Sequence, residues 1–137
     1  MTSYERSGWR DEDLSRRHRE WGIDCPAVDV DLLLVEFDHG RPSALIEYKH
    51  WRAALLERDH PSYKAIRALA DGSRIPFIAA RYWPEHWTFE GQSMNSAGER
   101  LLPRRQRFDE IGWVRFLYRL RGREMPVELT AQLRSAA

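Results

Sequence analysis

A predicted β-hairpin in the first half of the chain constrains the fold more than any other feature. Residues 28–37 and residues 43–50 are both rich in β-branched and large apolar side chains, which indicates two strands. Residues 38–40 separate them, and a three-residue loop with glycine last is typical of an antiparallel hairpin with a bulge. We therefore predict a hairpin in which Phe37 faces Arg41.

This register brings charged side chains together. Glu47 lies across from Asp31 and Lys49 lies across from Asp29, and all four share one face because side chains alternate between the faces of a strand. Opposed like charges destabilise a strand pair, and three carboxylates exceed what one ammonium neutralises. A hard divalent cation bound by oxygen ligands would offset this excess. The sequence therefore predicts a Mg²⁺ site, in which Mn²⁺ can substitute, at Asp29, Asp31 and Glu47.

The lysine of this group is unusual for the chain. Of the 22 basic residues, only Lys49 and Lys64 are lysines, and all the others are arginines. An ammonium is a compact charge whose pKa can be tuned, whereas a guanidinium is planar and always charged. Most of the arginine excess reflects the general composition of the chain, but at Lys49 a chemical role would explain why a lysine is present.

The remaining pattern predicts an α/β (α+β) architecture, in which a small mixed central sheet is flanked by helices. The length of 137 residues fits one domain spanning 1–137, with a core at about 9–85 and a C-terminal helical region at about 104–137. The periodicity predicts helices over 9–21, 62–70 and 107–121, further strands over 75–82 and 87–91, a short helix or loop over 51–59, a polar loop over 91–98, and a weak helix or frayed segment after 126.

Other protein classes are excluded by simple observations. No apolar run is long enough for a membrane-spanning helix, and the polar start lacks the apolar core of a signal peptide. A single cysteine, Cys25, cannot form an internal disulfide, and no Cys/His cluster has zinc spacing. We therefore expect an intracellular, cytoplasmic protein that does not bind membranes.

The acidic pair and the lysine also carry a resemblance to a known family. Asp31, followed after 15 residues by Glu47-Tyr48-Lys49 at the end of a hydrophobic strand, resembles the D…ExK signature of the PD-(D/E)XK nuclease superfamily. The stretch from about 16 to 50 is similar to small phage and bacterial members, and the resemblance covers roughly 9–85. It implies a restriction-endonuclease-like αβββαβ core and a Mg²⁺-dependent nuclease that hydrolyses phosphodiester bonds in nucleic acid, with DNA as the expected substrate.

The resemblance implies a role for each matching residue. Asp31 and Glu47 would bind Mg²⁺, with the backbone carbonyl of Tyr48 close by. The metal would lower the pKa of a bound water and stabilise charge on the scissile phosphate. Lys49 would position or polarise the attacking water and help neutralise the developing anion.

Three acidic positions leave alternatives open. Asp29 is either a second metal ligand or the motif aspartate itself. Many members of the family also use an acid on the helix before the hairpin, for which Glu12 and Glu20 are both candidates. The charged group also fits a solvated surface network. In that case the domain is a non-catalytic nucleic-acid-binding or protein-interaction module on the same fold.

Basic residues accumulate in the C-terminal region. Residues 100–123 contain eight arginines against two acids. Arg115, Arg119 and Arg123 form one stripe if the helix extends that far, and we predict that they contact nucleic-acid phosphates. The alternatives are a solvated helix face and, with the nearby aromatic residues, a homodimer seam.

Overall fold

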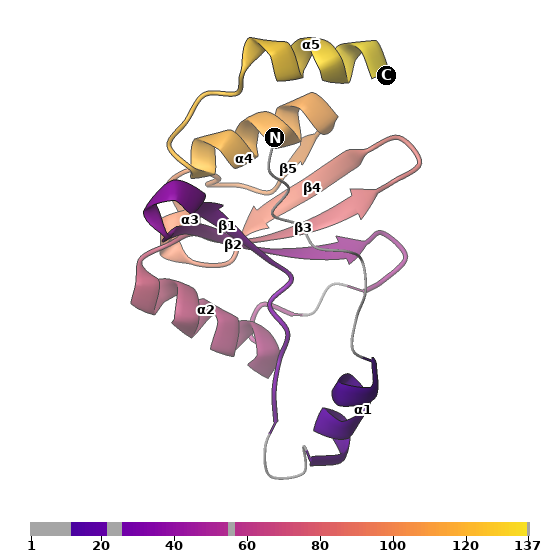
Figure 1. The fold of residues 1–137 in the computed structure, drawn as a ribbon, viewed down its shortest axis with the longest axis vertical. Helices are drawn as coiled ribbons and strands as arrows, with labels where there is room; N and C mark the ends of the chain where they lie inside the picture. Colours follow the sequence, from indigo (N-terminus) through magenta and orange to yellow (C-terminus); the bar gives the residue numbers. More distant parts are fainter. Residues whose placement is uncertain (1–11, 22–25, 55–56, 137) are drawn as a thin grey trace.

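The computed structural model describes residues 12–21, 26–54 and 57–136, and these residues contain one five-stranded mixed sheet (Figure 1). The strands follow the order β1-β2-β3-β4-β5 across the sheet. The β2–β3 pair is parallel, whereas the other neighbouring pairs are antiparallel. The strands are β1 (Leu32–Glu36), β2 (Arg41–His50), β3 (Phe77–Trp83), β4 (Thr88–Ser93) and β5 (Gln106–Phe108).

Helices cover both faces of this sheet. Helix α2 (Pro61–Ser73) lies on one face, and α4 (Glu110–Leu120) lies on the other with α5 (Val127–Ala136) beyond it (Figure 1). The four-residue helix α3 (Ser96–Glu99) follows β4, and α1 (Glu12–Trp21) lies away from the sheet at one end of the molecule (Figure 1). The predicted α/β class, a mixed sheet flanked by helices, is confirmed.

Alternation along β2 divides the apolar interior into two clusters. Ile46 is buried with Trp113 of α4 on one face, and Leu45 is buried with α2 on the other. Because side chains alternate, Glu47 and Lys49 leave β2 on the same face as Leu45. The acidic and basic groups of interest therefore belong to the α2 face of the sheet.

The predicted hairpin register is correct beside these groups and wrong at the turn. The three pairs made by Leu32–Leu34 follow the prediction. The register then shifts, so that Glu36 rather than Phe37 faces Arg41. The physical reason is that residues 37–39 curl into a 3₁₀ turn, which takes Phe37 out of the strand.

Several predicted boundaries differ from the structure. Strand β1 begins at residue 32 rather than 28. The segment 107–121, predicted as one helix, begins as part of β5 and becomes helical only after Asp109. The carboxylate of Asp109 accepts a hydrogen bond from the Gly112 N–H at 2.7 Å and caps α4. The segment 91–98, predicted as a loop, contains the end of β4 and most of α3.

The helical predictions also need adjustment. Helix α1 begins at Glu12 in the described residues, and residues 9–11 lie outside them. Helix α2 is longer than 62–70 because His60 caps it and Pro61 occupies its first position. The described part of 51–59 contains turns and no helix. Between α1 and α2 the described residues contain two strands, so the order departs from the αβββαβ core that the resemblance implies.

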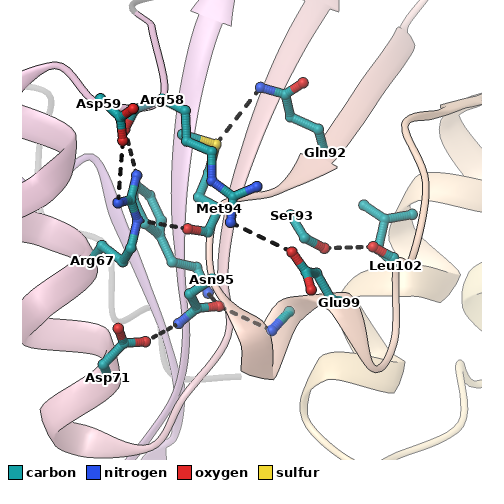
Figure 2. A network of polar contacts seen from close by, with 12 residues as sticks. Arg58, Asp59, Arg67, Asp71, Gln92, Ser93, Met94, Asn95, Glu99 and Leu102 are labelled. Atoms are coloured by element: carbon teal, nitrogen blue, oxygen red, sulfur yellow. Dashed lines mark hydrogen bonds and ion pairs between the residues drawn. The ribbon is translucent and has the colours of Figure 1, made fainter.

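Asn95 fixes the junction between the sheet, α2 and α3 (Figure 2). Its side-chain oxygen accepts hydrogen bonds from the Phe77 and Gly98 N–H groups, each at 2.9 Å. Its side-chain nitrogen donates to the Asp71 carboxylate at 3.0 Å and to the Ile75 carbonyl at 2.9 Å. The buried amide thus uses both lone pairs and both hydrogens, which satisfies its polar groups and positions three elements together.

Glu36 joins β1 to the segment that follows α4. Its carboxylate is buried and lies 3.0 Å from Nε of Arg121 and 2.9 Å from Nη2 of Arg123. The hydrogen bond from Arg121 lowers the pKa of Glu36 most, and Arg123 lowers it further by its hydrogen bond and charge. The end of α4 is therefore held to the edge of the sheet by a double ion pair.

We expect Glu36→Gln to lower the melting temperature by several degrees at neutral pH. A carboxyl group whose pKa is lowered by folding stabilises the fold above its ordinary pKa, and this contribution disappears as the pH falls through the folded-state value. The difference between the parent and the variant should therefore shrink in acid. Thermal melts at neutral and acidic pH test this, with exposed Asp38→Asn as the control. Equal melting temperatures at neutral pH would contradict it.

Candidate active site

Asp31, Glu47 and Lys49 meet where β1 begins and β2 nears its end. The Nζ atom of Lys49 lies 3.5 Å from the Glu47 carboxylate. The Asp31 carboxylate accepts a hydrogen bond from the backbone N–H of Tyr48 at 3.0 Å. This bond holds Asp31 beside the Glu47–Lys49 segment of β2, where its charge raises the pKa of Glu47. The structure thus brings together the three residues that the sequence predicts as catalytic.

Glu47 is held in an unfavourable environment for a carboxylate. Its residue is 7% exposed, and this burial is the largest cause of its raised pKa. The nearby charge of Asp31 raises the pKa further, and Lys49 lowers it only in part. Two carboxylates and one ammonium leave a net negative charge that a divalent cation would offset.

The donor set of this group fits Mg²⁺. Magnesium is usually bound by one or two carboxylates together with water and substrate phosphates. Asp31 and Glu47 supply the carboxylates, and the N–H of Tyr48 orients the first of them. Among the described residues, no group of three or more His, Cys, Asp or Glu side chains is arranged to hold a metal. The two carboxylates would therefore be the ligands that the protein provides to the metal.

The remaining acidic candidates do not join this group. Asp29 is exposed and precedes β1, and among residues 12–21, 26–54 and 57–136 no hydrogen bond or ion pair connects it to Lys49. Glu12 and Glu20 are exposed on α1, and Glu20 pairs with Arg17 at 3.7 Å. Figure 1 shows α1 away from the sheet, so the structure does not bring a helix acid to the site.

Tyr48, between the two motif residues, anchors β2 from the opposite face. Its hydroxyl accepts a hydrogen bond from Nε1 of Trp113 at 3.0 Å. Its ring makes edge contacts with Tyr82, Phe89 and Trp113. These contacts fix the strand against α4, which in turn fixes the positions from which Glu47 and Lys49 project.

The predicted arginine stripe is assembled, but on the face of the sheet opposite Glu47. Arg115 and Arg119 lie on α4, and Arg123 follows the end of the helix. With Arg134 of α5, they line a groove of about 500 Å³ between the two helices. Arg123 is already paired with the buried Glu36 carboxylate. The helix ends at Leu120, so the condition for a single helical stripe is not met and Arg123 lies beyond the helix.

Sequence reasoning missed a polar row beside Lys49. In the sheet register, Lys49 of β2 lies opposite Arg81 of β3. Arg81 lies opposite Glu90 of β4, which in turn lies opposite Arg107 of β5. Registered neighbours point to the same face, so this row continues across the α2 face from the candidate site. The available signal was Arg81 itself, which interrupts the apolar run over 75–80.

Among the described residues, no helix has the length and apolar character needed to cross a lipid bilayer. Comparison with known proteins found no matching family model, no matching curated protein and no matching solved structure.

Proposed function

We propose that this chain is a Mg²⁺-dependent nuclease that hydrolyses phosphodiester bonds in nucleic acid, with DNA as the expected substrate. The observation that carries the proposal is the convergence of Asp31, Glu47 and Lys49 at one point of the sheet. The resemblance of their spacing to the D…ExK signature supports the same reaction. A buried glutamate beside a second carboxylate is also the kind of unfavourable arrangement that proteins keep at functional sites.

The chain's own groups have distinct tasks in this reaction. Asp31 and Glu47 would hold Mg²⁺, which would supply a bound water of lowered pKa and would stabilise charge on the scissile phosphate. The N–H of Tyr48 keeps the Asp31 carboxylate oriented. Lys49 reaches the Glu47 carboxylate from the same strand, so its ammonium lies where it can orient the hydrolytic water and neutralise charge on the phosphate.

A cleavage assay tests this proposal. Purified protein is incubated with nicked, flapped, branched and single-stranded DNA, and with single-stranded RNA, in Mg²⁺ or Mn²⁺. We expect at least one substrate to be cut, with activity lost in EDTA and reduced about 10²–10³-fold by Asp31→Asn, the usual size for losing one electrostatic stabiliser. Asp38→Asn, at an exposed position in the hairpin turn, is the control. No cleavage of any substrate, or full activity in Asp31→Asn, would overturn the proposal.

The groove between α4 and α5 supports a contact with nucleic acid away from the cleavage site. Arg115, Arg119 and Arg134 line it, and Glu124 contributes the opposing charge. We propose that the arginines contact backbone phosphates there. If the parent protein binds DNA but cuts no substrate in Mn²⁺, the non-catalytic binding module becomes the better account.

A further inference from the structure

Arg81 lies beside the candidate catalytic lysine. It is the registered partner of Lys49 on the parallel strand β2 and of Glu90 on the antiparallel strand β4. Neighbouring strands are about 4.8 Å apart, and registered residues leave the same face. The guanidinium of Arg81 therefore belongs to the same face as Glu47 and Lys49, one strand further into the sheet.

The guanidinium of Arg81 forms no ion pair with another described residue. Its Nε is buried and has no hydrogen-bond partner there. Glu90, its registered partner on β4, pairs with Arg107 at 3.5 Å, and Glu47 on β2 pairs with Lys49 at 3.5 Å. A buried donor without a partner destabilises a protein, so such a group in a central strand calls for an explanation.

We propose that Arg81 binds a phosphate of the nucleic-acid substrate next to the cleavage site. The residue is only partly buried, so its side chain is not fully enclosed even though its Nε is covered. The forked guanidinium matches the oxygens of a phosphodiester, and the charge of a phosphate would compensate the unpaired cation. This inference rests on the proposed function, because it takes the substrate of the Asp31–Glu47–Lys49 group to be a phosphodiester.

The location of Arg81 also defines the path that the substrate backbone would follow across the sheet. Lys49 on β2 and Arg81 on β3 form a line that leads from the edge hairpin toward the middle of the sheet. A nucleic-acid backbone held by both bases would cross the α2 face from β1 toward β4. Arg107 lies further along this line, but it is paired with Glu90 and stacked over the ring of Trp83 at 4.8 Å.

The test measures binding separately from cleavage. Fluorescently labelled branched DNA is titrated with the parent, Arg81→Gln, Arg81→Lys and Arg104→Gln in EDTA, at several KCl concentrations. We expect Arg81→Gln to weaken binding about tenfold, the loss expected for one charge-assisted hydrogen bond. The slope of log affinity against log salt should fall by about 0.7–0.9, the contribution of one phosphate contact. Arg81→Lys should keep the parent's slope, and Arg104→Gln, at an exposed arginine outside this row, should change affinity and slope much less than Arg81→Gln.

The outcomes separate this proposal from the nuclease assignment. If Arg81→Gln binds with the affinity and salt slope of the parent, or if the parent does not bind the DNA, the phosphate contact of Arg81 is refuted. A change in melting temperature with an unchanged salt slope would also refute it, because that is the result of a purely structural role. If binding depends on Arg81 while the parent cuts no substrate in Mg²⁺ or Mn²⁺, the contact stands and the nuclease assignment fails.

Discussion

Lys49→Arg should abolish cleavage while preserving the fold and the net charge. The lysine side chain is 29% exposed, and its Nζ lies 3.5 Å from the Glu47 carboxylate. Arginine keeps the charge but replaces a compact ammonium by a longer, planar group, which cannot occupy the same point beside Glu47. We expect the cleavage rate in Mg²⁺ to fall about 10²–10³-fold, the usual effect of losing one electrostatic stabiliser of the transition state.

The chain offers a matched control for this substitution. Lys64, the other lysine, is exposed on α2, and Lys64→Arg makes the same chemical change away from the site. Initial rates on the best substrate should be unchanged in Lys64→Arg, and thermal melts should show that both variants fold. A Lys49→Arg variant that cuts as fast as the parent would remove Lys49 from the catalytic group.

Glu47→Gln should abolish cleavage and, in the absence of metal, stabilise the protein. Burial and then the charge of Asp31 raise the pKa of Glu47. A carboxyl group whose pKa is raised by folding contributes its full stabilisation below its ordinary pKa, and this contribution is lost as the pH rises through the folded-state value. Glutamine is neutral at every pH and similar in shape. At neutral pH in EDTA, we expect Glu47→Gln to be more stable to unfolding by about 1 kcal/mol, a typical gain at a strained functional site.

A divalent metal should reverse this order of stability between the parent and Glu47→Gln. Mg²⁺ that binds the folded state raises its stability by mass action, so it should raise the melting temperature of the parent. The variant lacks one of the two carboxylates and should respond little. Melts with EDTA and with Mg²⁺ test this, and Glu57→Gln, at an exposed glutamate, is the control. A Glu47→Gln variant that is less stable than the parent in EDTA would contradict the electrostatic account of the site.

The candidate site was predictable because its residues are close in sequence. Strand alternation and a short loop determine which face each side chain of a hairpin occupies, and a shift at the turn did not disturb the pairs beside the site. Asp29 differs from Asp31 in this respect. Strand pairing begins at Leu32, and the hydrogen bond from the Tyr48 N–H keeps Asp31 beside β2, whereas the predicted pairing does not extend to Asp29.

Features that depend on distant segments were not predictable in the same way. Arg81 lies beside Lys49 only because β3 adds parallel to β2 after α2, and no local pattern encodes that pairing. The face of the sheet that α4 covers likewise depends on long-range packing around Trp113. Phe108 is an apolar residue that suits a strand or a helix equally. Because Asp109 caps the start of α4, Phe108 is the last residue of β5 instead of part of the helix.

Calorimetric titration with Mn²⁺ tests the central claim, that Asp31 and Glu47 form a divalent metal site, most directly. The account predicts that the parent binds Mn²⁺ at neutral pH without any nucleic acid and that Asp31→Asn loses this binding. Asp29→Asn, a change at the exposed neighbour of the same charge, should retain it. No Mn²⁺ binding by the parent, or equal binding by the parent and Asp31→Asn, would contradict the account.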